Sequence, residues 1–209
     1  MATISIKRLA EIRMLYYDRK LSMSDIAKHY NVSLDKVVYF MRRNNLTRRS
    51  HSLNNSIRFE RKPLSFKLKN KLTKYQLELK NFGIALYWGE GYKAEGGSGI
   101  DFANSDVKMI VVFLNFLRVI CGVDEKRLRV LLYCYSNQDI EKLLGFWSKR
   151  TKIPLSQFSK PYVRYDFRKE KINKMPFGLI HIRYQDKKLR ALILEWIEEY
   201  KNKFAQIVP

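Results

Sequence analysis

The pattern of apolar and polar positions predicts a small helical bundle in the first fifty residues. From Leu9 to Tyr16, apolar residues recur three or four positions apart, which is the spacing of a helix that buries one face. Two shorter helices are expected over residues 22–30 and 34–45, because each apolar stretch there follows a serine that can cap a helix. The N-terminal region is therefore expected to be entirely helical.

Beyond residue 74, helical spacing alternates along the chain with the period-two pattern of strands. Helices are predicted over residues 74–89, 106–122, 137–152 and 187–204. Strands are predicted over residues 98–105, 127–135, 161–167 and 177–184. We expect an α+β fold, in which the small helical bundle precedes a mostly antiparallel sheet of about four strands that helices cover on one face.

Residues 51–73 separate these two regions. The segment is polar and basic, contains Pro63, and shows no clean helical or strand period. It is predicted to be a basic linker that lies on phosphates, and a solvated loop is the alternative. The expected organisation is a first domain over residues 1–50, this linker, and a second domain over residues 74–209.

The charge of the chain narrows the choice of partner. The 209 residues include 41 lysines and arginines against 20 acidic residues, which gives a formal net charge of +21. The first third is the more densely basic part, with 18 basic and 5 acidic residues in positions 1–74. So large an excess favours a polyanionic partner. Nucleic acid is the first candidate, because neutralising phosphates releases counterions and drives binding.

An anionic membrane surface is the second candidate, and the sequence argues against it. No stretch reaches the roughly 20 apolar residues of a spanning helix, and the N-terminus lacks a signal-peptide pattern. A cytoplasmic, nucleoid-associated protein is therefore expected, with no membrane partner and no evident small-molecule substrate. Cys121 and Cys134 are expected to be reduced and buried, and the scattered histidines predict no zinc site.

Residues 21–46, LSMSDIAKHYNVSLDKVVYFMRRNNL, resemble the helix-turn-helix of bacterial regulators and recombinases. The match lies in the small Ala27 where two helices would cross, the apolar Val32 in the turn, and Val37 and Val38 on the second helix. A second helix of this kind enters the major groove with its N-terminal face.

The helix-turn-helix resemblance implies two sets of DNA contacts. The residues expected to face base edges are Ser33, Leu34, Lys36 and Tyr39. The residues expected to reach phosphates or an adjoining minor groove are Arg42, Arg43, Arg48 and Arg49. The alternative is a small helical bundle that contacts another protein.

The end of the helix predicted over residues 74–89 reads FGIALYWGEG and resembles the LAGLIDADG motif of homing endonucleases and their relatives. The stretch GIDFANSDVKMIVVFLNFLRVICGV, which follows, is also similar to that family in its strand, polar step and helix. The resemblance covers roughly residues 75–205. The sequence differs from the commonest form of the motif at Tyr87 and Trp88, where smaller residues are frequent.

The LAGLIDADG resemblance implies a metal site and a dimer. Glu90 aligns with the acid that holds the catalytic metal, the backbone of Gly89 is a further candidate ligand, and the implied cofactor is Mg²⁺ or another divalent cation. The chain shows one copy of the motif, and single-motif members of the family act as homodimers. A basic residue is expected near the scissile phosphate. Lys160 is the candidate, with Lys174 as the alternative.

The spacing of small residues in this motif favours close packing of two helices. Ala85 and Gly89 are four residues apart on one helix face, so a second helix could approach closely, and Trp88 is placed in the same interface. Two Glu90 carboxylates brought together would repel each other unless divalent cations bridged them. The alternative is a helix that packs into the core and ends with Gly91 as its cap.

The predicted strands carry apolar residues on one side and arginine, tyrosine and histidine on the other. The residues expected to contact DNA from the polar side are Arg127, Arg129, Tyr133, Arg164, Arg168, His181 and Arg183. Such a surface can lie along a major groove, with arginines on guanine edges or on phosphates.

These features together predict a homodimeric, Mg²⁺-dependent homing endonuclease that hydrolyses phosphodiester bonds of double-stranded DNA. A DNA-binding transcriptional regulator with the same fold and without cleavage is the second interpretation. An intron maturase that binds structured RNA is the third, and the helix-turn-helix pattern favours duplex DNA over it.

Overall fold

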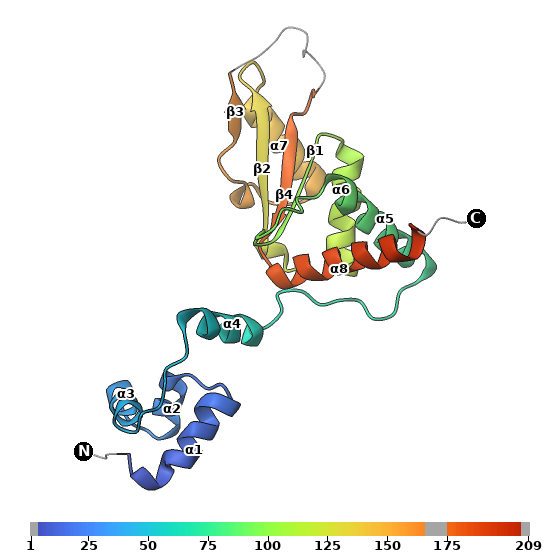
Figure 1. Cartoon of the computed structure of the whole chain (residues 1–209). Coiled ribbons are helices and arrows are strands. Elements are labelled where there is room, and N and C mark those ends of the chain that lie inside the picture. The colour runs from blue at the N-terminus through green and yellow to red at the C-terminus, as the bar shows by residue number, and fades with distance from the viewer. Residues whose placement is uncertain (1–3, 166–174, 206–209) are drawn as a thin grey trace. The chain divides into compact units, whose positions relative to one another are not determined.

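The computed structural model of the chain describes residues 4–165 and 175–205, and these form two compact units, Met1–Pro63 and Leu64–Pro209 (Figure 1). The first unit is helical, and the second contains the sheet. The predicted α+β class is therefore confirmed.

The first unit is built from short helices, and residues between Ile4 and Leu46 form its small apolar core. Its helices are α1 (Leu9–Arg13), which continues into a π-helical turn (Met14–Asp18), α2 (Met23–His29), α3 (Leu34–Arg43) and α4 (His51–Arg61). Ile12, Ile26 and Val37 are fully buried, whereas Val38 is half-buried and the neighbouring Phe40 takes the inner position. Because these residues come from three different helices, their burial holds the helices together.

Residues 51–61 form a helix, in contrast to the irregular linker predicted for them. Ser50 caps α4 by accepting a hydrogen bond from the Leu53 amide at 3.1 Å. Within α4, Ile57 is the buried residue, whereas Leu53 and Phe59 are exposed. The helix has few apolar residues, so its composition resembles that of a polar linker.

Most of the remaining predicted linker belongs to the second unit. The units divide between Pro63 and Leu64, and Phe66 is buried in the core of the second unit. The backbone amide of Lys67 donates to the Gly122 carbonyl at 3.0 Å. Gly122 has a φ of +58°, and a Cβ there would lie 2.1 Å from the Lys67 oxygen, so this close approach requires glycine.

The second unit alternates helices and strands as its sequence pattern predicts. Its helices are α5 (Lys74–Glu90), α6 (Val107–Asn115), which continues into a π-helical turn (Phe116–Ile120), α7 (Ile140–Thr151) and α8 (Lys187–Phe204). Its strands are β1 (Ile100–Asn104), β2 (Leu128–Tyr135), β3 (Tyr162–Arg164) and β4 (Leu179–Tyr184).

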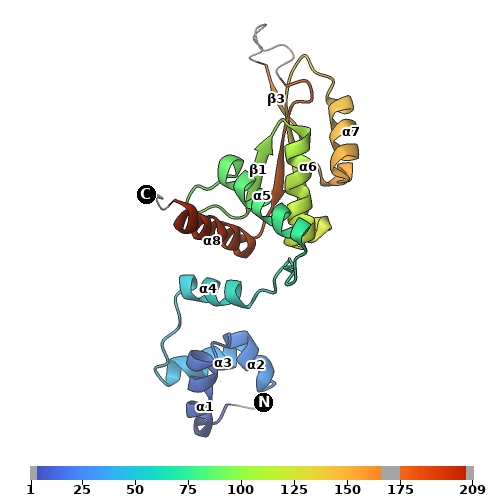
Figure 2. The ribbon, with the colours of Figure 1, turned by 90° about the vertical axis from the view of Figure 1, so that its right-hand side faces the viewer.

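The four strands form one mixed sheet in the order β1-β4-β2-β3. β4 pairs antiparallel with both β1 and β2, and β3 adds to β2 in parallel. Alternate residues of β1, β2 and β4 are buried beneath the helices, and α5, α6 and α7 lie on the same side of the sheet (Figures 1 and 2). No helix in the described part of the chain covers the other face, which is called the outward face below.

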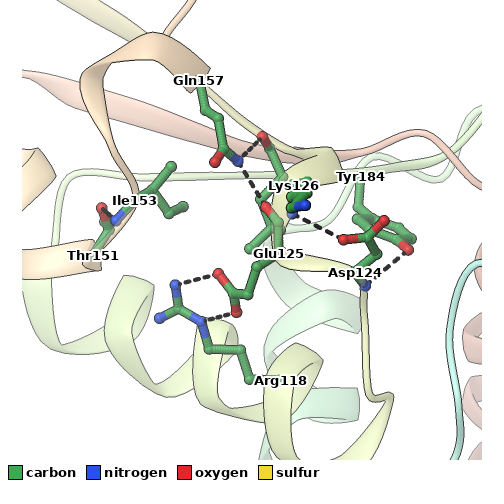
Figure 3. Close-up of polar contacts among 9 residues, drawn as sticks. Arg118, Asp124, Glu125, Lys126, Thr151, Ile153, Gln157 and Tyr184 are labelled. Carbon is green, nitrogen blue, oxygen red and sulfur yellow. Dashed lines mark hydrogen bonds and ion pairs between the residues drawn. The ribbon is translucent and has the colours of Figure 1, made fainter.

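A polar network anchors the start of β2 (Figure 3). Arg118 donates to both carboxylate oxygens of Glu125, at 2.5 and 2.9 Å. The amide of Gln157 donates to the carbonyls of Glu125 and Leu128, each at 2.7 Å. These bonds hold the loop before β2 in place. They therefore position the start of this strand and its outward-facing side chains.

Both cysteines are free and buried, as predicted, and burial raises the pKa of the Cys121 thiol to about 12. Among the described helices, none combines the length and the apolar character needed to cross a membrane.

Candidate nucleic-acid interface and candidate metal site

The outward face of the sheet gathers most of the polar residues predicted on the strands. The register places Asp101, Arg183 and Arg129 in one row across β1, β4 and β2. It places Ala103, His181 and Leu131 in the next row. Alternation of the strands therefore brings side chains that are distant in sequence onto one surface.

Asp101 joins two of the predicted DNA-contacting residues. Its Oδ1 lies 2.7 Å from Nδ1 of His181, and its Oδ2 accepts from Nε of Arg183 at 2.8 Å. Burial raises the pKa of this carboxyl, but the bonds and charges of His181 and Arg183 outweigh burial and hold the pKa below its usual value. Sequence reasoning missed Asp101, although its position on the polar side of a predicted strand could have indicated it.

A row of aromatic rings continues from this cluster across the outward face. The ring of Tyr133 lies 4.8 Å from that of His181 and 4.8 Å from that of Tyr162, measured between centroids. Tyr162 is 55% exposed on the edge strand. The row offers polar and flat apolar surface together, which suits contact with bases and sugars.

Two further arginines predicted to contact DNA, Arg127 before β2 and Arg129 on it, are partly held by local bonds. Arg127 donates to the Gln185 carbonyl at 2.6 Å and lies over the Tyr184 ring. Nη1 of Arg129 donates to the carbonyls of Lys126 and Leu128, each at 2.7 Å. Arg129 is exposed, so the rest of its guanidinium can reach a ligand.

Arg164 and Arg168 complete the set predicted on the strands. Arg164 is exposed on β3 and lies 5.9 Å from the centre of the Tyr135 ring. Arg168 lies outside the described residues.

In the first unit, α3 carries most of the predicted contacts on its surface. Tyr39 is 52% exposed, Arg42 and Arg43 are exposed, and Lys36 is half-buried. Ser33 occupies the N-cap position of α3, and its side chain makes no capping hydrogen bond.

Arg48 and Arg49 differ in what they can contact. Arg48 is exposed. Arg49 instead turns into the first unit, where it donates to the carbonyls of Tyr16 at 3.2 Å and Leu21 at 2.6 Å. Its guanidinium also stacks on the Tyr16 ring at 4.1 Å. Arg49 therefore binds the backbone of the first unit, and Arg48 is the more accessible of the two predicted phosphate contacts.

Glu90 is the last residue of α5, and its side chain is exposed. Among the described residues it makes no hydrogen bond or ion pair. Gly91 follows as the C-cap and is buried. A Cβ there would lie 2.3 Å from the Tyr87 ring, so this position requires glycine. Beside this helix end, the Lys93 ammonium donates to the Gly91 carbonyl at 2.8 Å. The sequence prediction did not include Lys93, although its position three residues after Glu90 could have indicated it.

The helix face predicted for the dimer is exposed on the single chain. Ala85, Trp88 and Gly89 are exposed, as is Phe82 on the same helix, at 60%. Nothing lies within 4 Å of the position that a Cβ on Gly89 would take. This apolar surface of α5 is therefore available to a partner.

Lys160 lies toward the opposite edge of the sheet from Glu90. The row of paired residues between them runs through Gly91, Phe102, Ile182, Val130 and Phe158. Four spacings of about 4.8 Å cross this row, so Phe158, two residues before Lys160, is on the order of 19 Å from Gly91, which follows Glu90. The structure does not bring this predicted pair together within one chain, and Lys93 is the basic residue beside the motif.

A metal site is not complete in the described part of one chain. No group of three or more histidine, cysteine, aspartate or glutamate side chains gathers there in a way that could hold a metal ion. Glu90 supplies one exposed carboxylate, so further oxygen ligands would have to come from another chain or from a bound phosphate.

Comparison with known proteins identifies no relative, since no family model, no curated protein and no solved structure matches the chain.

Proposed function

We propose that this chain binds specific sites on double-stranded DNA and, as a homodimer, hydrolyses phosphodiester bonds with Mg²⁺. The observation that carries the proposal is the outward face of the sheet, which no described helix covers and on which arginine, histidine and tyrosine side chains converge. The net charge of +21 supports a polyanionic ligand.

Cleavage is proposed from the LAGLIDADG resemblance together with the environment of Glu90. The acid is exposed and unpaired within the described residues, at the end of a helix with an exposed apolar face. Two copies packed along this face would bring two Glu90 carboxylates together, and both could bind Mg²⁺. When bound, the metal would supply charge stabilisation and an activated water.

The experiment compares the wild-type protein with Glu90→Gln on a DNA library in the presence of Mg²⁺. We expect the wild type to cut selected duplexes and Glu90→Gln to bind them without cutting. Glu95→Gln is the matched control, because it removes the same charge from an exposed loop position and should still cut.

A non-cleaving DNA-binding regulator is the second candidate. It is favoured by the single carboxylate that each described chain offers at the motif, since the metal site depends on a second copy. Tight, sequence-specific binding without strand breaks in either protein would establish this second function and refute the first.

A further inference from the structure

Asp101 is an acidic side chain among the basic residues of the outward face. It pairs across the sheet with Arg183, which in turn pairs with Arg129. It uses one carboxylate oxygen for His181 and the other for Arg183. A carboxylate that holds two cationic or polar neighbours in this way fixes their orientation.

Arg183 keeps the end of its guanidinium free. Its Nε is bound to Asp101, and within the described residues neither Nη atom has a hydrogen-bond partner. The side chain is 31% exposed on a central strand of the sheet. The two Nη groups therefore form a donor fork that is restrained at its base and open to a ligand.

The neighbouring carboxylate decides which ligand suits this fork. A phosphate bound there would lie close to the negative charge of Asp101, and like charges at short distance repel. A guanine presents two neutral acceptors, O6 and N7, in the major groove, and a bidentate arginine matches them. A base edge is thus favoured over the DNA backbone.

His181 is held by the same carboxylate. Its Nδ1 lies 2.7 Å from an Asp101 oxygen, and a proton on Nδ1 makes this contact a hydrogen bond. In the tautomer that carries its only proton on Nδ1, Nε2 is an acceptor. Nε2 has no partner among the described residues. It can accept from the amino group of a cytosine or an adenine next to the guanine.

We propose that Asp101 is a positioning residue that orients Arg183 to read one guanine in the major groove, so that this residue pair determines one position of the recognised sequence. The inference rests on the proposed binding of duplex DNA and names the base that one part of that surface recognises.

The test uses the full chain to select binding sites from a random library of DNA duplexes. The selection is carried out in Ca²⁺, so that binding is measured independently of cleavage. The variants are Arg183→Lys, which keeps the charge and loses the fork, and Asp101→Asn, which weakens the hold on Arg183. Glu95→Gln is the control, because it makes the same change of charge as Asp101→Asn. Circular dichroism during heating checks that each variant is folded.

For the wild type we expect a guanine whose replacement by adenine weakens binding about 10-fold or more. In Arg183→Lys, replacing this guanine by adenine should weaken binding less than about twofold. In Asp101→Asn, the preference for guanine over adenine should be at least about threefold smaller than in the wild type. Glu95→Gln should keep the wild-type preference. Because Arg183→Lys can still pair with Asp101, it tests the fork even if Asp101→Asn fails to fold.

Two results would overturn the inference while leaving DNA binding intact. One is a guanine preference that survives unchanged in Arg183→Lys. The other is an equal loss of affinity for all sequences in both variants, which is the behaviour of a phosphate contact. If the wild type binds no duplex DNA, the proposed function itself fails, and the inference fails with it.

Discussion

Glu90 is placed at the end of a helix where a negative charge is unfavourable. The C-terminal end of α5 carries partial negative charge, and the Lys93 ammonium at the Gly91 carbonyl offsets it. The exposed Glu90 side chain has no such bond within the described residues. Its location is therefore better explained by a ligand than by the stability of the fold.

This reasoning predicts that Glu90→Gln does not destabilise the chain. Removing the charge from the helix end should leave the free energy of unfolding unchanged or raise it by about 0.3–1 kcal/mol. Urea unfolding of the two proteins measures the difference, with Glu95→Gln as the control for net charge. A loss of stability greater than about 1 kcal/mol would assign Glu90 a structural role.

Asp101 should give the stability of the chain a defined dependence on pH. Its pKa in the folded chain is lower than its usual value of 3.8. It therefore stabilises the fold above about pH 4, and this contribution is lost as the pH falls through the folded pKa. At pH 6 we expect the free energy of unfolding of the wild type to exceed that of Asp101→Asn by about 1–3 kcal/mol, because the substitution replaces a carboxylate that accepts two hydrogen bonds.

The difference in free energy of unfolding between wild type and Asp101→Asn should decrease below pH 4. Urea midpoints measured between pH 3 and pH 6 give the comparison. A gap that stays constant over this range would show that the charge of Asp101 does not contribute to folding.

At the scale of elements, the two glycines of α5 have opposite surroundings. A Cβ on Gly83 would lie 2.2 Å from the Phe116 ring, whereas one on Gly89 would meet nothing within 4 Å. Gly83→Ala should therefore destabilise the chain by about 1–3 kcal/mol through overpacking. Gly89→Leu should leave stability unchanged or raised, since leucine favours a helix. Thermal unfolding compares the two, and equal losses would contradict the difference in packing.

How well an element could be predicted depended on how much of it is buried. α5, α6, α7 and α8 each bury a stripe of apolar residues, and their periodicity identified them. α4 buries Ile57 alone, and its polar, basic composition predicts a linker.

Features set by distant parts of the chain could not be read from local pattern. The parallel addition of β3 to β2 depends on pairing between segments that are far apart in sequence. The bond of Asp101 to His181 spans 80 residues, and the inward turn of Arg49 is decided by carbonyls of the earlier segment. The strand pattern gave the composition of the outward face, and the sheet order determined which of its side chains meet.

For the whole molecule, the net charge of +21 predicts DNA binding that is strongly dependent on salt. If six to ten phosphates are contacted, affinity should fall about 10³–10⁵-fold between 50 and 200 mM salt. Arg129→Gln, on the outward face, should reduce the logarithmic slope by about one if it contacts a phosphate. Lys142→Gln is the control, because Lys142 pairs with Asp139 at the start of α7. An unchanged slope in Arg129→Gln would remove that residue from the set of phosphate contacts.

The exposed face of α5 makes the proposed homodimer testable independently of DNA. Ala85, Trp88 and Gly89 lie on this face, and a side chain added at Gly89 meets nothing in the single chain. Gly89→Leu should therefore keep the fold and obstruct a second helix. Light scattering after size exclusion should give twice the chain mass for wild type and the chain mass for Gly89→Leu. Because paired Glu90 carboxylates require two chains, this variant should also lose cleavage while each sheet still binds DNA. A wild type that stays monomeric both free and on DNA would exclude the paired metal site and leave the regulator as the function that the outward face supports.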